Sequence, residues 1–132
     1  MYCLAASASV SFHWGRRNIT RMLEIAAWHE DELCLVAVED ERAVGFASAR
    51  IDRGSGLLPG LLGQIEALYI TPPARTRGLS RRLANATIAA LHERGADVVH
   101  NLICIDDDDA RSFWQAIGFA PDMVCLSLYR EG

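Results

Sequence analysis

One continuous run of the chain, Gln64 to Ile105, constrains the fold most. It begins with a strand-length segment, Gln64–Ile70, and the two prolines that follow end it because proline cannot donate a ladder hydrogen bond. Apolar residues at helical spacing predict a long helix from about Gly78 to Arg94, followed by a strand rich in Val, Ile and Leu over Asp97–Ile105. Strands that alternate with helices in this way indicate an α/β architecture with a mixed sheet.

The rest of the chain extends this pattern without an internal repeat or a linker, so we expect a single domain over residues 1–132. The predicted element order is α-β-β-β-α-β-α-β, a mixed sheet flanked by helices. The further expected elements are an irregular or edge segment (1–14), a helix (Asn18–Trp28), a hairpin of two strands (Leu33–Val38 and Ala43–Ile51), a loop (Arg53–Gly60), a helix after an acidic run (Ala110–Ile117) and a closing strand (Val124–Tyr129).

Composition excludes several classes of protein. A net charge of −4 and a pI near 5.5 argue against a nucleic-acid-binding surface, which usually carries a strong basic excess. No apolar run reaches the roughly 18 residues that a membrane span needs. The four cysteines are widely separated, without a CxxC pair, so we expect neither a zinc site nor a disulfide scaffold, and a cytoplasmic location.

The loop between the third strand and the long helix has the chemistry of a phosphate site. A helix N-terminus leaves backbone N–H groups without partners, and the helix dipole adds partial positive charge. Gly78 lets the backbone approach an anion, Ser80 is small enough to add a hydroxyl, and Arg75 and Arg77 can add charge-assisted hydrogen bonds. The alternative is a basic surface turn before an ordinary helix, and spacing alone does not separate the two.

Two motifs resemble those of the GNAT N-acetyltransferase superfamily. The first reads Arg75-x-x-Gly78-x-Ser80 after Ile70-Thr71-Pro72, against the family pattern Q/R-x-x-G-x-G/A. The second reads Asp107-x-x-Ala110-x-x-x-Trp114-x-x-x-Gly118-Phe119, against N-x-x-A-x-x-x-Y-x-x-x-G-F, with correct spacing and two substitutions. The likeness covers about Leu33 to Tyr129. It implies a GNAT-like acyl-CoA N-acyltransferase fold, abridged at the N-terminus, with one strand after Phe119 instead of two, so that a homodimer partner could complete the sheet.

The resemblance implies a cofactor, acetyl-CoA or another acyl-CoA, and an acceptor that is a small-molecule amine or a protein amino group. In the family, the strand before the loop splays from its neighbour and pairs with the pantetheine arm, and the acyl thioester lies in that cleft. No metal is expected. The cofactor-binding residues carried over to this sequence are Leu68, Tyr69, Ile70, Arg75, Thr76, Arg77, Gly78, Leu79, Ser80, Asp107 and Trp114.

Glu66 is the candidate general base. A lysine-like amine is almost entirely protonated at neutral pH, so a base that accepts its proton is useful. Alternation assigns Glu66 to a mostly apolar strand face with Gln64, Leu68 and Ile70, and apolar surroundings would raise its pKa. It also matches a position that the family's catalytic glutamate often occupies. The alternative is an exposed carboxylate on an edge strand.

Trp114 and Asp107, the two substitutions in the second motif, leave other functions open. Trp114 stands where the family often has a tyrosine that protonates the leaving thiolate, and indole cannot act as a general acid. Water or Tyr129 could replace it, or the chain could be a regulatory module that binds acyl-CoA and transfers slowly or not at all. A nucleotide-phosphate binder is a third reading, but the chain lacks GxxxxGK[ST] and GxGxxG.

The run Asp106–Asp109 is expected to cap a helix, and consecutive side chains diverge too much for a metal site.

Overall fold

The computed structural model describes residues 31–39, 42–53 and 60–131. The predicted helix Asn18–Trp28, the segment 1–14 and most of the loop Arg53–Gly60 lie outside these residues. The chain divides after Leu102 into two compact units. None of the described helices is long and apolar enough to cross a membrane.

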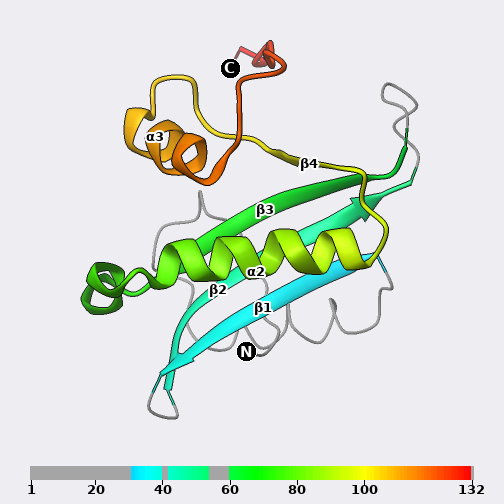
Figure 1. The fold of residues 1–132 in the computed structure, drawn as a ribbon. Helices are drawn as coiled ribbons and strands as arrows, with labels where there is room; N and C mark the ends of the chain where they lie inside the picture. The colour runs from blue at the N-terminus through cyan, green and yellow to red at the C-terminus, as the bar shows by residue number, and fades with distance from the viewer. Residues whose placement is uncertain (1–30, 40–41, 54–59, 132) are drawn as a thin grey trace. The chain divides into compact units, whose positions relative to one another are not determined.

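The first unit contains a four-stranded mixed sheet in the order β1-β2-β3-β4 (Figure 1). Its first two strands form the predicted antiparallel hairpin, β3 is antiparallel to β2, and β4 is parallel to β3. The strands are each longer than the apolar runs that predicted them, except β4, which is much shorter than the predicted Asp97–Ile105. Their bounds are Glu32–Glu39 for β1, Arg42–Asp52 for β2, Leu62–Ile70 for β3 and Val98–Asn101 for β4.

Helix α2 (Leu79–Glu93) lies across one face of the sheet, where it contacts β1, β2 and β3 (Figure 1). It follows a short 3₁₀ helix, η1 (Pro72–Arg77), and confirms the long helix that periodicity predicts. Its buried side chains follow the predicted apolar stripe, and Gly95 has a positive φ of 97° just after its end. The buried stripe consists of Leu83, Ala84, Thr87 and Leu91.

A β-bulge in β3 changes which residues face α2. Ser48 pairs with Ala67 and Ala49 pairs with Ile65, so Glu66 is an extra residue without a partner on β2. Before the bulge Gly63 and Ile65 lie on the α2 face, whereas after it Leu68 and Ile70 do. The predicted alternation, which put Glu66 on one face with Leu68 and Ile70, is therefore wrong, because one inserted residue reverses the period of two.

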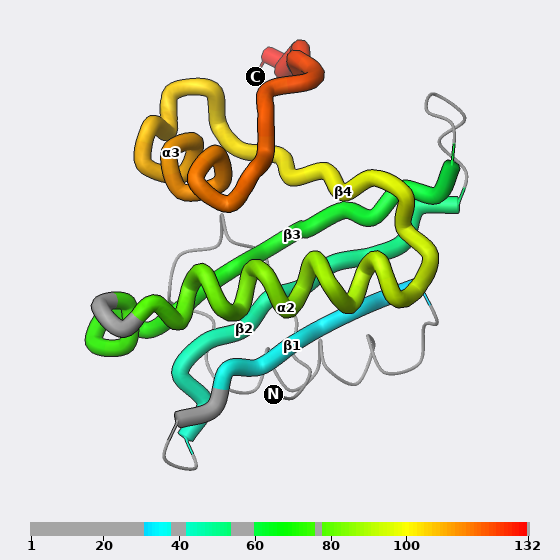
Figure 2. The backbone as a smooth tube through the Cα atoms, in the orientation of Figure 1, coloured from blue at the N-terminus to red at the C-terminus, as the bar shows by residue number. Residues whose placement is uncertain are grey.

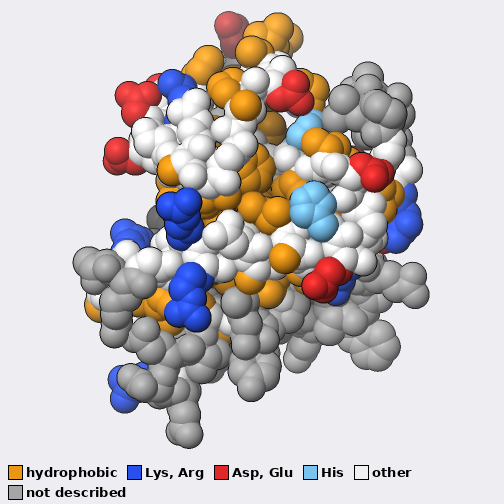
Figure 3. Space-filling model, in the orientation of Figure 1, with side chains coloured by type: hydrophobic (Ala, Val, Ile, Leu, Met, Phe, Trp, Pro, Cys, Tyr) orange, Lys and Arg blue, Asp and Glu red, His pale blue; other side chains and the backbone are white. Residues whose placement is uncertain are grey.

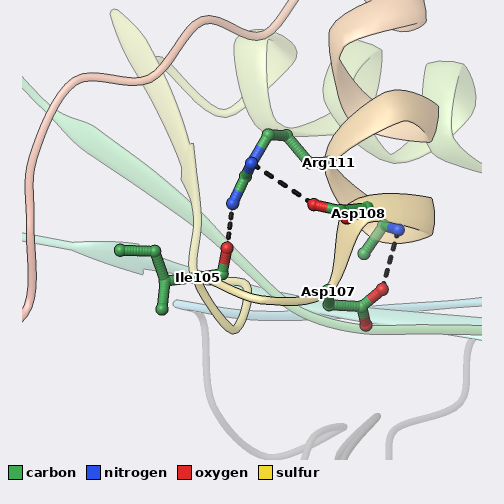
Figure 4. Close-up of polar contacts among 5 residues, drawn as sticks. Ile105, Asp107, Asp108 and Arg111 are labelled. Carbon is green, nitrogen blue, oxygen red and sulfur yellow. Dashed lines mark hydrogen bonds and ion pairs between the residues drawn. The ribbon is translucent and has the colours of Figure 1, made fainter.

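The second unit contains helix α3 (Asp108–Ile117) and an extended tail. The carboxylate of Asp107 accepts a hydrogen bond of 3.0 Å from the Ala110 amide, which confirms the predicted cap (Figure 4). Arg111 donates to the Ile105 carbonyl and lies 3.5 Å from the carboxylate of Asp108 (Figure 4).

The predicted closing strand, Val124–Tyr129, is wrong for the described tail. Residues 119–131 form no regular secondary structure, and Leu126 and Leu128 are 91% and 100% exposed. The apolar alternation of this segment is that of a strand, but a strand persists only when another strand completes its hydrogen bonds. No strand of the described chain pairs with this segment.

Candidate active site

The free edge of β3 defines the site. β4 pairs with β3 over only four residues, and the last pair joins Ile65 with Asn101 (Figure 2). Beyond that pair, no strand in the described part of the chain accompanies Glu66–Ile70 on this side. The backbone of this stretch thus offers N–H and C=O groups to an extended ligand, as the resemblance implies for a pantetheine arm.

A tight turn carries the chain from the free edge of β3 to the start of α2. The Thr71 amide donates to the Val44 carbonyl at 2.7 Å, and the Ala74 amide donates to the Thr71 carbonyl at 2.9 Å. Ala74 is buried in a core cluster with Ile70 and Leu83. These contacts fix the loop against the sheet, so the residues predicted to bind phosphate follow the free edge at a defined place.

Arg75 is anchored to the end of β3. Its Nε donates to the Ile70 carbonyl at 2.9 Å, and its guanidinium carbon lies 5.5 Å from the centroid of the Tyr69 ring. The Tyr69 ring in turn contacts Phe46, with centroids 5.8 Å apart. These contacts orient the guanidinium on the loop. Its two terminal nitrogens remain as further hydrogen-bond donors.

The beginning of α2 fits an anion. Gly78 is the N-cap with a φ of 70°, and no side chain caps the helix, whose first hydrogen bond joins the Arg82 amide to the Gly78 carbonyl. A Cβ at Gly78 would meet nothing within 4 Å, so its surface is open to a ligand. Leu79 and Ser80 are half-buried, while Arg81 and Arg82 are exposed, and Figure 3 shows basic side chains near the beginning of α2. Thr76 and Arg77 belong to η1 by their backbone.

Glu66 lies on the face of the sheet away from α2. Its Oε1 is 3.0 Å from Nε of Arg50, and the side chains of the pair are 41% and 46% exposed, respectively. A half-exposed ion pair of this kind stabilises the fold by about 0–1 kcal/mol. The carboxylate is therefore exposed, and it lies at the bulge where the free edge begins. Its role as the general base stays a prediction.

The pKa of Glu66 is raised above its ordinary value. Partial burial is the largest cause, and the negative charge of Glu32 on β1 raises the pKa further. The positive charge of Arg50 acts in the opposite direction and lowers it. The direction agrees with the prediction from the sequence, although the supposed apolar strand face is not the reason, since the bulge moves Glu66 away from Leu68 and Ile70.

Asp107 and Trp114 belong to the second unit, whereas the other predicted site residues belong to the first. Asp107 already uses Oδ1 to cap α3. Trp114 is buried, and its ring makes edge-on contacts with Phe113 and Phe119 at 5.0 and 5.2 Å between centroids. Within this unit, both residues have structural roles that explain their presence without a ligand.

Arg50 and Glu32 are the neighbours of Glu66 that the sequence did not reveal. Arg50 is directly opposite Glu32 on β1 and Gln64 on β3. The available signal was a charged residue near the end of an otherwise apolar segment, Ala43–Ile51. That signal names no partner, because the pairing depends on strand register and on the bulge.

Comparison with known proteins adds a family profile and two relatives. The profile of the acetyltransferase (GNAT) family matches residues 5–119. Mycothiol acetyltransferase of Arthrobacter sp. (strain FB24) is 30% identical over 121 residues, which are 87% of this chain and 37% of that protein. N-alpha-acetyltransferase 30 of Schizosaccharomyces pombe is 28% identical over 101 residues, 76% of this chain and 66% of that protein. This chain thus spans little more than a third of the first relative.

Among solved structures, the chain is similar to the AAC(6')-Iy complex with the bisubstrate analogue CoA-S-monomethyl-acetylneamine. The TM-score is 0.76 at 20% identity, and the match covers 92% of this chain and 84% of that one. At this identity the likeness shows a shared fold. It agrees with the fold class predicted from the sequence.

Proposed function

The chain belongs to the acetyltransferase (GNAT) family, and from that premise we propose that it transfers an acetyl group from acetyl-CoA to a primary amine by direct transfer in a ternary complex. The observation that carries the proposal is the continuity of the free edge of β3, from Glu66 to Ile70, with the uncapped start of α2 at Gly78. An extended arm followed by a pyrophosphate has the shape and charge for such a surface.

Different residues would hold the two parts of the cofactor, the pantetheine arm and the pyrophosphate. The backbone of Leu68, Tyr69 and Ile70 would pair with the pantetheine arm, since the Ile70 side chain is occupied in the core. The pyrophosphate would accept hydrogen bonds from the backbone N–H groups of the loop at Gly78, Leu79 and Ser80. Hydrogen bonds to a charged group contribute about 1.5–3 kcal/mol each, more than the roughly 0.3–1 kcal/mol of the helix dipole. Arg75, Thr76 and Arg77 complete the proposed loop.

Bound acetyl-CoA would supply the activated acyl group as a thioester. Glu66 would accept a proton from the amine nitrogen as that nitrogen forms its bond to the acyl carbon. A raised pKa suits this role because a base works best when its pKa is close to the working pH. The proton needed by the departing thiolate would come from water, because an indole at Trp114 cannot supply it.

The acceptor, the cellular location and the oligomeric state are the less specific parts of the proposal. Mycothiol acetyltransferase and N-alpha-acetyltransferase 30 bear names that point to a small molecule and to a protein, so both a small amine and a protein amino group stay in the proposal. Cys104 and Cys125 are free thiols, which supports the cytoplasm. A homodimer is supported by the unpaired apolar segment Val124–Tyr129.

The cofactor site can be tested by calorimetry of acetyl-CoA binding with two variants of one residue. Asn and Asp both tolerate the positive φ of Gly78 and differ in charge. We expect Gly78→Asp to weaken binding by about 10–100-fold, because it places a carboxylate beside the pyrophosphate and disturbs at least one charged hydrogen bond. Gly78→Asn should retain most of the affinity. Absence of binding to folded wild type would overturn the proposed cofactor.

A second function is favoured by one observation, the buried packing of Trp114 at the position of the family's tyrosine. A chain without that acid could bind acyl-CoA as a regulatory module and transfer slowly. Thiol release from acetyl-CoA over a panel of primary amines separates the two functions. Saturable cofactor binding without amine-dependent release would favour the regulatory module, whereas release that saturates with one amine would favour the enzyme.

A further inference from the structure

Three charged residues from three neighbouring strands lie on the sheet face away from α2, and the proposed chemistry uses only one of them. Glu32 on β1 is paired with Arg50 on β2, and Arg50 contacts Glu66 on β3 through the 3.0 Å ion pair. We call these residues the three-strand charge array. The array contains one guanidinium and two carboxylates, so it carries one net negative charge when both acids are ionised.

The bulge places this array where the free edge begins. Gln64 is paired with Arg50, and Glu66 alternates with Gln64, so Glu66 lies on the face of Arg50, away from α2. Because the inserted residue reverses the alternation after it, Leu68 and Ile70 pack under α2 and do not continue the face of Glu66. The bulge thus separates the base candidate from the apolar residues that follow it on the same strand.

The contact between Arg50 and Glu66 suits a positioning role. It joins Nε of Arg50 to Oε1, so the other carboxylate oxygen can accept a proton while Oε1 still accepts a hydrogen bond from Arg50. A guanidinium nitrogen on one oxygen also fixes the direction of the carboxylate plane. Orientation of this kind matters because a misplacement of about 1 Å can cost about 100-fold in rate.

We propose that Arg50 is a positioning residue that holds Glu66 at the free edge of β3, and that Glu32 and Arg50 together set the pH at which Glu66 serves as the base. The inference rests on the proposed function, in which Glu66 accepts the amine proton. Its new content is that the working pH is determined by residues of the neighbouring strands β1 and β2.

The two neighbours act on the pKa of Glu66 in opposite directions. Arg50 stabilises the carboxylate and lowers the pKa, and Glu32 repels the carboxylate and raises the pKa. Removal of the Arg50 charge should therefore raise the pKa, and removal of the Glu32 charge should lower it. Other titratable groups share this sheet face and belong in the comparison: Asp52 on β2, Tyr69 on β3 and His100 on β4.

The experiment measures the pKa of Glu66 directly and through the reaction. Carbon-13 NMR of labelled glutamate carboxyls would give the pKa in wild type, Arg50→Gln, Glu32→Gln and Arg50→Lys, with Glu66→Gln to assign the signal. The pH dependence of kcat/KM, with acetyl-CoA and a primary amine that is turned over, gives the second readout. The matched control is Arg53→Gln, since Arg53 forms an exposed ion pair of 2.7 Å with Asp31 and none with Glu66.

We expect Arg50→Gln to move the NMR titration and the acid limb of kcat/KM to higher pH, and Glu32→Gln to move both to lower pH. Arg50→Gln should also lower the plateau rate by up to about 100-fold, with partial rescue by Arg50→Lys. Arg53→Gln should move neither readout.

Two results would overturn the inference at different points. If neither variant moves the NMR titration in folded protein, the array does not control Glu66. If the NMR titration moves and the acid limb does not, Glu66 is not the base, while the cofactor site tested by the Gly78 variants stands or falls separately.

Discussion

The two halves of β3 have the same strand partner on one side and different surroundings on the other. Leu62–Ile65 lies between β2 and β4, whereas Glu66–Ile70 pairs with β2 alone in the described chain. Gly63 and Ile65 lie under α2 in the first half, and the second half opens with a half-exposed acid. One strand thus combines a stretch that secures the fold with a stretch whose hydrogen bonds are available to a ligand.

The boundary between the halves is a single inserted residue, Glu66. The bulge ends the run in which Gly63 and Ile65 face the helix, and it coincides with the last pair between β3 and β4. Bulges often occur next to active sites, where they redirect a side chain. The comparison teaches that stability and proposed chemistry are separated along one strand, so substitutions on either side of the bulge should have different consequences.

The largest effect is expected at the boundary itself. Glu66→Gln keeps the size of the side chain and removes its ability to accept a proton, so kcat/KM should fall by about 10²–10⁴-fold. Stability should change by less than about 1 kcal/mol, because the ion pair that is lost is half-exposed. Steady-state kinetics and denaturant unfolding of the same preparation provide both values.

The pH dependence of stability gives a control for this variant. The folded-state pKa of Glu66 is raised, so the fold favours the protonated acid, and this contribution is lost as the pH rises through the folded pKa. Glu66→Gln should therefore gain stability relative to wild type on the alkaline side of that transition. A large loss of stability at every pH would mean that Glu66 is structural and would remove the separation between the two halves.

The next effect compares two fully buried leucines of α2. Leu91 packs over the first half of β3, since a Cβ added at Gly63 would lie 3.3 Å from the Cβ of Leu91. Leu83 instead belongs to the core cluster of Ile70, in the second half. Either Leu→Ala change should cost about 2–5 kcal/mol of stability through the cavity it leaves. We expect only Leu83→Ala to raise the KM for acetyl-CoA as well.

Thermal unfolding and acetyl-CoA titration below the unfolding range distinguish these two leucines. An equal rise in KM for both variants would indicate that α2 responds as a rigid whole, and the functional contrast between the halves of β3 would then be lost.

Sequence patterns predicted the hairpin, α2, the cap of α3 and the class of fold, since these depend on local periodicity and cap chemistry. The start of α2 after the motif Arg75–Ser80 was predicted because helix starts have a local signature, and the anion site itself stays a prediction. The bulge at Glu66 was not found, because the inserted residue carries no glycine or proline signal and the register that reveals it is a property of two strands.

The failed strand Val124–Tyr129 has the same physical origin. Its alternation is real, but alternation describes a side-chain pattern, and a ladder requires a partner strand. For Arg50 the sequence shows only a charged side chain. The residues that face it on β1 and β3 follow from the strand register, which the sequence pattern does not give.

The smallest expected effect compares alanine substitutions at two glycines, Gly45 beside the second half of β3 and Gly63 in the first half. A Cβ at Gly45, opposite Ile70, would lie 2.3 Å from Ile70 Cδ1 and 2.5 Å from the Tyr69 carbonyl oxygen, so the backbone of the second half must shift. A Cβ at Gly63 would lie 3.1 Å from Ala96 Cβ, which requires an adjustment of a few tenths of an ångström. Gly45→Ala should thus cost about 1–3 kcal/mol and Gly63→Ala less than about 1 kcal/mol.

The functional readout of this glycine pair is acetyl-CoA affinity. Gly45→Ala displaces the Tyr69 backbone, which is proposed to pair with the pantetheine arm, so its affinity should fall even where the protein is fully folded. Gly63→Ala changes the packing under α2 and should leave the affinity unchanged. If Gly63→Ala weakens acetyl-CoA binding as much as Gly45→Ala does, the bulge at Glu66 does not separate the two halves of β3. Acetyl-CoA affinity would then depend on the whole length of the strand.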